Sequence, residues 1–131
     1  MLDKLLARVK SGVSGRVRRA KLAVHDRTRL TAIVQMGDCR VLAEVTNPRE
    51  LSRLAAYGIK EPGTIEWIDR ALGEGDVLYD IGANIGLFGI YAAMRHPGLG
   101  RVYSFEPESQ NFASLNRQVL RNGLVNRVVP L

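Results

Sequence analysis

The spacing of hydrophobic and polar positions changes several times along the chain, and each spacing predicts a different element. Residues 2–10 repeat apolar side chains every three or four positions, which predicts a short amphipathic helix. Residues 31–36 and 40–45 are two runs of β-favouring side chains on either side of a turn that contains Gly37. This arrangement predicts a β-hairpin, which we expect to cover part of the core ahead of a main sheet.

Two helices are expected after the hairpin. The first starts with Asn47 as its N-cap and a proline after it, and Gly58 ends it. The second runs from Thr64, its expected N-cap, to Gly73, and Trp67 is expected to anchor it in the core. The apolar sides of the two helices consist of Leu51, Leu54, Ala55, Ile65, Ile68, Ala71 and Leu72.

From residue 77 onward, strands alternate with helices. The predicted elements are a strand at 77–80, a helix at 87–94, a strand at 101–105, a helix at 108–122 and a strand at 125–131. This order predicts an α/β fold with a parallel sheet. The last helix is expected to bury Phe112, Leu115, Val119 and Leu120, to turn Arg117 and Arg121 to water, and to end at Gly123.

The turn between the first of these strands and its helix carries candidate chemistry. Asp80 stands at the carboxyl end of the strand, where open α/β sheets bind their ligands. Gly82 and Gly86 allow the backbone to turn sharply and to approach a ligand closely. The free N–H groups at the start of the following helix favour electron-rich ligand groups. This segment therefore predicts a ligand site with a fixed negative charge beside it.

A second acidic residue follows at the spacing that a nucleoside cofactor requires. Glu106 ends the next strand, 20 residues after Gly86. In doubly wound folds an acidic residue there accepts hydrogen bonds from a ribose, and the two oxygens of a carboxylate suit a vicinal diol. The glycines do not follow the G-x-G-x-x-G spacing that cradles a pyrophosphate, and Asp80 would face that phosphate charge. A nicotinamide-dependent dehydrogenase is therefore kept as an alternative.

Three segments resemble the FkbM-type methyltransferases. D-I-G-A-N-I-G at 80–86 resembles motif I of the class I S-adenosylmethionine-dependent methyltransferases, with Asn84 in place of the central glycine, as in the FkbM type. K-E-P-G-T-I-E-W-I at 60–68 and V-Y-S-F-E-P at 102–107 are similar to FkbM-type segments. The resemblance covers about residues 47–131. It implies a Rossmann-like class I methyltransferase sheet, truncated here after about three parallel strands, and transfer of a methyl group from S-adenosylmethionine to an oxygen atom.

The resemblance also implies a set of cofactor-binding residues. They are Asp80, Gly82, Ala83, Asn84, Gly86 and Glu106. Of these, Asp80 would hold the turn and the amino group of the cofactor, and Glu106 would bind the ribose. Glu61 and Thr64 lie where this family covers the methionine end of the cofactor, although a helix cap is their expected role. No catalytic residue and no metal site is assigned, and the chain is expected to be inactive alone. The acceptor is expected to be a small molecule such as a sugar, a glycan or a polyketide.

Positive charge is concentrated at the N-terminus. Residues 1–30 hold nine Lys and Arg against two acidic residues, a net charge of +7, whereas the whole chain of 131 residues carries +6. This arm could contact an anionic membrane surface weakly, and it makes a non-catalytic binding module a further alternative. The arm has no aromatic side chains to stack on bases, so nucleic acid is not expected as a partner.

The cysteine content indicates the cellular compartment, and the motifs indicate how the chain is divided. Cys39 is the only cysteine, so an intramolecular disulfide is excluded and a reducing, cytoplasmic location is expected. His96 is expected at a helix end, in a surface role. The expected organisation is a basic extension at 1–30, a hairpin with helices at 31–73, and the first half of an S-adenosylmethionine-binding domain at 74–131. The sequence leaves the oligomeric state open.

Overall fold

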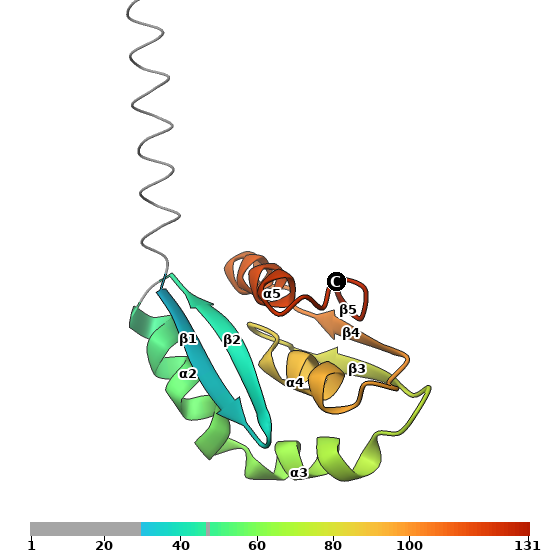
Figure 1. Ribbon diagram of the computed structural model, residues 1–131. Helices are drawn as coiled ribbons and strands as arrows, with labels where there is room; N and C mark the ends of the chain where they lie inside the picture. Colours follow the sequence, from blue (N-terminus) through green and yellow to red (C-terminus); the bar gives the residue numbers. More distant parts are fainter. Residues whose placement is uncertain (1–29, 47) are drawn as a thin grey trace, which may run out of the picture. The chain divides into compact units, whose positions relative to one another are not determined.

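The computed structural model describes residues 30–46 and 48–131, so the predicted helix at 2–10, the rest of the basic arm up to residue 29 and the predicted cap at Asn47 lie outside the described residues. The elements are β1 (Leu30–Met36), β2 (Cys39–Val45), α2 (Pro48–Lys60), α3 (Pro62–Ala71), β3 (Val77–Ile81), α4 (Leu87–Arg95), β4 (Arg101–Phe105), α5 (Ser109–Arg121) and β5 (Val128–Pro130) (Figure 1). β1 and β2 form the predicted hairpin. None of the described helices has both the length and the apolar character of a membrane span.

β3, β4 and β5 form a parallel sheet in that order. Val77 lies opposite Arg101 and Ile81 opposite Phe105, so β3 and β4 end at the same edge. α4 connects β3 to β4 and α5 connects β4 to β5, as parallel strands require. The predicted α/β fold is therefore confirmed. β5 is shorter than the strand predicted at 125–131, because a turn occupies the residues before Val128.

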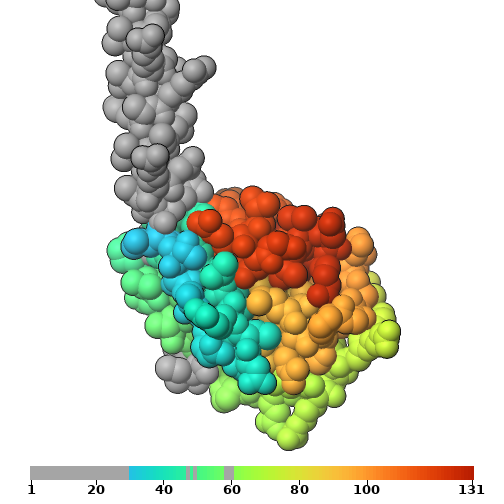
Figure 2. Space-filling model, in the orientation of Figure 1, coloured from blue at the N-terminus to red at the C-terminus, as the bar shows by residue number. Residues whose placement is uncertain are grey.

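α4 and α5 cover one face of the sheet, and the hairpin packs against both helices (Figure 1). Figure 2 shows the side chains of the hairpin, α4 and α5 adjoining one another on this side. Fully buried side chains of the core include Val41, Leu87, Ile90 and Val102. Thr31–Leu131 form one compact unit, and the division predicted inside it at residue 73 stays a prediction.

The other face of β3 and β4 is aromatic. Because side chains alternate between the faces of a strand, buried Leu78 points toward the helices while Tyr79 points away. The Tyr79 ring stacks on Tyr103 with centroids 5.5 Å apart and on Phe105 at 6.1 Å. Tyr79 is 61% exposed and Ile81 75% exposed, so this face presents apolar surface to solvent.

The packing of α5 differs from the prediction on its polar positions. Phe112, Leu115 and Val119 are on the buried side as predicted. Leu120 is 70% exposed, however, while Gln118 is fully buried. Arg117 and Arg121, predicted to face water, both form ion pairs with Glu44 of β2, at 3.3 Å and 3.7 Å. The reason is that α5 contacts the hairpin as well as the sheet, so a second side of the helix is covered.

The boundaries of α2 and α3 also differ from the prediction. α2 continues through Gly58. α3 begins at Pro62, whose missing N–H is not needed in a first turn, so Glu61 takes the N-cap position. The predicted N-cap Thr64 lies inside the first turn, and its hydroxyl donates to Glu61 Oε2 at 3.2 Å. Pro62 thus sets the start of the helix, two residues before the predicted cap.

The apolar sides of these helices are only partly buried. Leu54 and Ile68 lie in the core, whereas Leu51, Ala55 and Ala71 are exposed. Trp67, predicted as a core anchor, is 51% exposed. α3 packs on α4 through Ile68, and one residue of helix is a rotation of about 100°, which carries Trp67 away from that contact.

The end of α4 is fixed by two later residues. His96 is the C-cap of α4, in agreement with its predicted place at a helix end. Its ring Nε2 lies 2.9 Å from the Ile68 carbonyl oxygen of α3. Arg127 donates from Nη1 to the Ala93 carbonyl at 2.5 Å and from Nη2 to the His96 carbonyl at 2.7 Å. A guanidinium here satisfies carbonyls that the helix leaves without partners.

Candidate cofactor-binding site

The turn after β3 is built from left-handed backbone. The angle φ is +78° at Gly82, +53° at Asn84 and +83° at Gly86. In the part of the chain that the structure describes, Asn84 is the one residue other than glycine with a positive φ, and asparagine tolerates this conformation better than most residues. The N–H groups of Gly82 and Ala83 both donate to the Phe105 carbonyl at 2.9 Å. The turn is therefore held against the end of β4.

The two motif glycines are needed for different reasons. A Cβ on Gly82 would meet no atom within 4 Å, so the backbone there faces open space that a ligand can enter. A Cβ on Gly86 would overlap Leu115 Cδ1 of α5. Gly86 also precedes the first residue of α4 as its N-cap. Gly86 therefore serves the packing of α4 on α5, and Gly82 leaves access to the turn.

Glu106 joins the turn to the end of β4. Its Oε2 accepts the Asn84 N–H at 2.7 Å, and its Oε1 accepts the Glu108 N–H at 2.9 Å. Each carboxylate oxygen has two lone pairs, so these bonds leave one acceptor site on each oxygen. The turn and the acidic residue at the end of β4 are thus joined by a direct hydrogen bond, and the predicted binding of a ribose by Glu106 stays a prediction.

Asp80 lies beneath the start of α4. Its Oδ2 and the Ser104 Oγ are buried, and neither has a partner of good hydrogen-bond geometry among the described residues. Both atoms lie under Gly89, where an added Cβ would be 3.1 Å from Asp80 Oδ2 and 2.7 Å from Ser104 Oγ. Burial raises the pKa of the Asp80 carboxyl, the Gly89 N–H and the Ser104 hydroxyl oppose the rise in part, and the charge of Glu106 adds to it.

Two cavities open onto the turn. The cavity over the end of β3, here called the β3 cavity, has a volume of about 390 Å³, and the cavity between α2 and the turn, the α2 cavity, has about 350 Å³. Tyr57, Glu61, Asn84 and Phe88 line both. Of the predicted cofactor-binding residues, Asp80, Gly82, Ala83 and Asn84 line the β3 cavity, whereas Gly86 and Glu106 do not line it and instead hold the turn.

Carboxylates are the charged groups that line the β3 cavity, whereas the α2 cavity is lined by one carboxylate and one guanidinium. Burial raises the pKa of Tyr57 to about 12, with the charge of Asp80 as the next cause; Arg53 opposes the rise, and Glu61 and Glu106 add to it. Among the described residues that line either cavity, Arg53 is the one with a positive charge. The β3 cavity therefore favours cationic ligand groups, whereas the α2 cavity can accept charges of both signs.

Part of the chain is similar in sequence to a curated methyltransferase. Over 54 residues, 41% of this chain, the sequence is 44% identical to the 31-O-demethyl-FK506 methyltransferase FkbM of Streptomyces tacrolimicus. The resemblance to FkbM-type methyltransferases is confirmed. The chain spans 20% of the length of that relative. No family model matches the chain.

Solved structures of methyltransferases share the fold. The tRNA m1G37 methyltransferase of M. jannaschii has a TM-score of 0.52 at 18% identity, over 79% of this chain and 30% of its own. Trm5 of Methanocaldococcus jannaschii, in complex with adenosine, has a TM-score of 0.51 at 18% identity, with the same shares covered. The parallel sheet described above therefore has the Rossmann-like class I methyltransferase fold.

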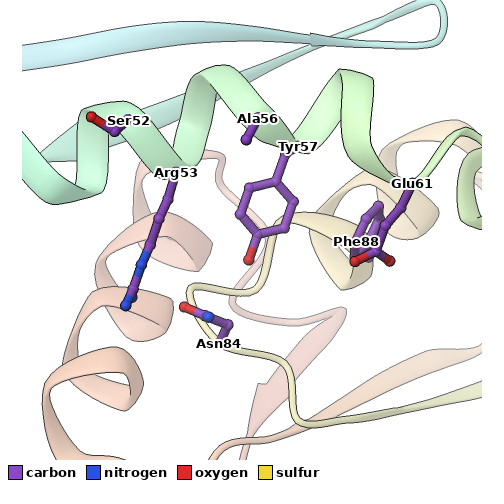
Figure 3. A pocket seen from close by; sticks show the side chains of 7 residues that line it. All are labelled: Ser52, Arg53, Ala56, Tyr57, Glu61, Asn84 and Phe88. Carbon is purple, nitrogen blue, oxygen red and sulfur yellow. The ribbon is translucent and has the colours of Figure 1, made fainter.

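α2 contributes a part of the site that was not predicted from the sequence. Arg53 and Tyr57 reach from this helix toward the turn, as Figure 3 shows. The available signal was their spacing of four residues, which places two side chains on one face of a helix. Trp67, which was expected in the core, lines the β3 cavity instead. The structure thus brings a helix far from the motif in sequence onto the same cavity.

Proposed function

We propose that this chain is the cofactor-binding part of an FkbM-type S-adenosylmethionine-dependent methyltransferase. The whole protein would methylate an oxygen atom of a sugar, a glycan or a polyketide-like acceptor. The observation that carries the proposal is the hydrogen bond from the Asn84 N–H to Glu106 Oε2. It places a carboxylate with free acceptor capacity beside a turn whose Gly82 faces open space.

The charges of the site fit this cofactor. When bound, S-adenosylmethionine supplies an electrophilic methyl group on a cationic sulfonium. Asp80 and Glu61 line the β3 cavity and would attract the sulfonium and the amino group. Glu106 would accept hydrogen bonds from the two ribose hydroxyls. The same carboxylates would repel the pyrophosphate of a dinucleotide, which is why the dehydrogenase alternative is the weaker one.

The chain's own residues would act mainly by positioning. Such chemistry gains chiefly from holding two reactants in line, so a rigid turn matters more than a reactive side chain. Gly82, Ala83 and Asn84 are fixed by their N–H bonds to Phe105 and Glu106 before any ligand arrives. For this chain the proposal is cofactor binding, and transfer to an acceptor is proposed for the whole protein.

The chemistry of the acceptor is proposed from the curated relative. Its name states that it acts on 31-O-demethyl-FK506, and this chain spans a fifth of its length. Three expectations about residues 1–30 stay predictions, because residues 1–29 lie outside the described residues. They are weak contact with a membrane surface, a function as a binding module through that arm, and the absence of a nucleic-acid partner.

A thermal melt with S-adenosylhomocysteine tests the proposal. A ligand at about 100 times its dissociation constant adds about 2.7 kcal/mol to the folded state that binds it. We expect the transition to move upward with S-adenosylhomocysteine and to stay in place with NAD. The substitution Glu106→Gln keeps the shape of the side chain and should remove most of the shift, whereas Arg101→Met at the opposite end of β4 should retain it.

Two results would reject the proposal. If S-adenosylhomocysteine leaves the transition of the unmodified chain unmoved, cofactor binding by this chain is wrong. If NAD moves the transition instead, the dehydrogenase alternative is favoured, and the carboxylates that line the cavity do not exclude a pyrophosphate.

A further inference from the structure

The α2 cavity holds a positive charge that the ribose and the sulfonium of the proposed cofactor do not use. Arg53 reaches from α2 toward the turn, and Figure 3 shows its guanidinium close to the side chain of Asn84. Its Nη1 lies 3.5 Å from Asn111 Oδ1 in the first turn of α5. A guanidinium has five N–H donors, so this long contact leaves donors available for a ligand.

Tyr57 provides a second donor in the same cavity. It follows Arg53 by four residues on α2, and both side chains therefore point to the same side. Its pKa of about 12 keeps the hydroxyl protonated at neutral pH. Its ring packs on Phe88 with centroids 5.3 Å apart, which holds the hydroxyl in place and gives the cavity an apolar wall.

The α2 cavity has opposite charges at its two ends. Figure 3 shows Arg53 at one end and Glu61 at the other, with Tyr57 between them. A free amino-acid group carries an ammonium and a carboxylate, and therefore matches such a cavity. A phosphate fits less well, because its second negative charge would be placed near Glu61 without a second cation.

We propose that Arg53 binds the carboxylate at the amino-acid end of the cofactor, with the Tyr57 hydroxyl as a second donor. The inference rests on the proposed function and extends it, because it assigns a residue of α2 to recognition of one chemical group. Guanidinium and carboxylate form paired, charge-assisted hydrogen bonds, which are among the stronger polar contacts in proteins. Arg53 therefore distinguishes ligands with a carboxylate from those without one.

The test compares two ligands that differ only in this carboxylate. They are S-adenosylhomocysteine and S-adenosyl-3-thiopropylamine, titrated into the unmodified chain and into Arg53→Met by calorimetry. We expect the unmodified chain to prefer S-adenosylhomocysteine about tenfold, as a charge-assisted hydrogen bond predicts. In Arg53→Met this preference should vanish, because binding of S-adenosylhomocysteine weakens while binding of the amine is unchanged.

Further variants separate recognition from folding. Arg53→Lys keeps the charge and loses the paired geometry, so it should retain an intermediate preference. Tyr57→Phe should lower the preference by a smaller factor, and Arg101→Met, an exposed arginine at the other end of the sheet, should keep it in full. A melt of each variant without ligand checks that the variant folds. If Arg53→Met does not fold, Arg53→Lys still decides the test.

The outcomes separate this inference from the proposed function. If the unmodified chain binds both ligands equally, or if Arg53→Met weakens both by the same factor, Arg53 does not recognise the carboxylate, although cofactor binding stands. If Arg53→Met changes neither, the inference is also wrong. If the unmodified chain binds neither ligand, the proposed function fails, and this inference falls with it.

Discussion

Gln118 of α5 pairs with both backbone groups of Glu44 in β2. Its Oε1 accepts the Glu44 N–H at 2.7 Å, and its Nε2 donates to the Glu44 carbonyl at 2.9 Å. Asn122 makes the same pair of bonds to Leu42, at 2.9 Å and 2.7 Å. Four residues of helix rise about 6 Å and two residues of strand about 6.8 Å, so the two spacings match. The amides of α5 thus cover the strand edge as a third strand would.

Loss of this pairing should destabilise the fold. Gln118→Leu keeps the approximate volume but removes both bonds from a fully buried position, so we expect the free energy of unfolding to fall by about 2–4 kcal/mol. Urea denaturation measures the change. Asn116→Ala, an exposed residue on the same helix, is the control and should change stability by no more than about 0.5 kcal/mol. If Gln118→Leu and Asn116→Ala change the free energy of unfolding equally, the hydrogen bonds between α5 and the edge of β2 contribute nothing to stability.

The motif glycines should tolerate alanine unequally. Gly86→Ala would strain a left-handed residue and overlap Leu115, so we expect a loss of about 3 kcal/mol or more from the two effects together. Gly82→Ala places the new Cβ in open space, so backbone strain alone should lower its free energy of unfolding, by about 1–2 kcal/mol. Gly123→Ala, also left-handed and open, is the matched control for strain alone. A Gly86→Ala variant no less stable than Gly123→Ala would contradict the packing role.

Local patterns predicted the parts of the fold that local chemistry determines. The positions of β3, the turn and β4 follow from residues whose conformation depends on their neighbours in sequence, whereas the binding of one ligand by Asp80 and Glu106 stays a prediction. Burial of Gln118 could not be predicted, because an amide is buried only when another element offers it both a donor and an acceptor. Trp67 was placed in the core for a related reason, since periodicity does not say which side of α3 meets α4.

The exposure of Trp67 can be measured directly, because it is the only tryptophan of the chain. At 51% exposed, its fluorescence should be quenched by acrylamide in the folded chain almost as readily as in urea. Because Trp67 lines the β3 cavity, S-adenosylhomocysteine should reduce this quenching. Strong protection without ligand would restore the expectation that Trp67 is a core residue.

Stability should depend on the pH through Asp80. Its pKa is raised in the folded state by burial, so the folded state holds this proton more tightly than the unfolded chain does. The stabilisation is fully present below the ordinary pKa of 3.8 and is lost as the pH rises through the higher folded value. Asp80→Asn should remove this part of the pH dependence and be the more stable protein at neutral pH, which urea denaturation between pH 3 and pH 8 would detect. An unchanged pH profile would argue against a buried charge at this position.

Arg127 separates stability from ligand binding. Its guanidinium caps α4 at the end opposite the motif turn, through the carbonyls of Ala93 and His96. Arg127→Met should therefore lower the free energy of unfolding by about 1–3 kcal/mol, because carbonyls in a partly buried helix end lose a charged donor. Binding of S-adenosylhomocysteine, measured by calorimetry below the melting range, should change less than twofold, since Gly86 and Leu115 fix the other end of α4. If the free energy of binding falls by as much as the free energy of unfolding, α4 transmits a displacement along its length. The turn is then held by the whole helix rather than by its first residues.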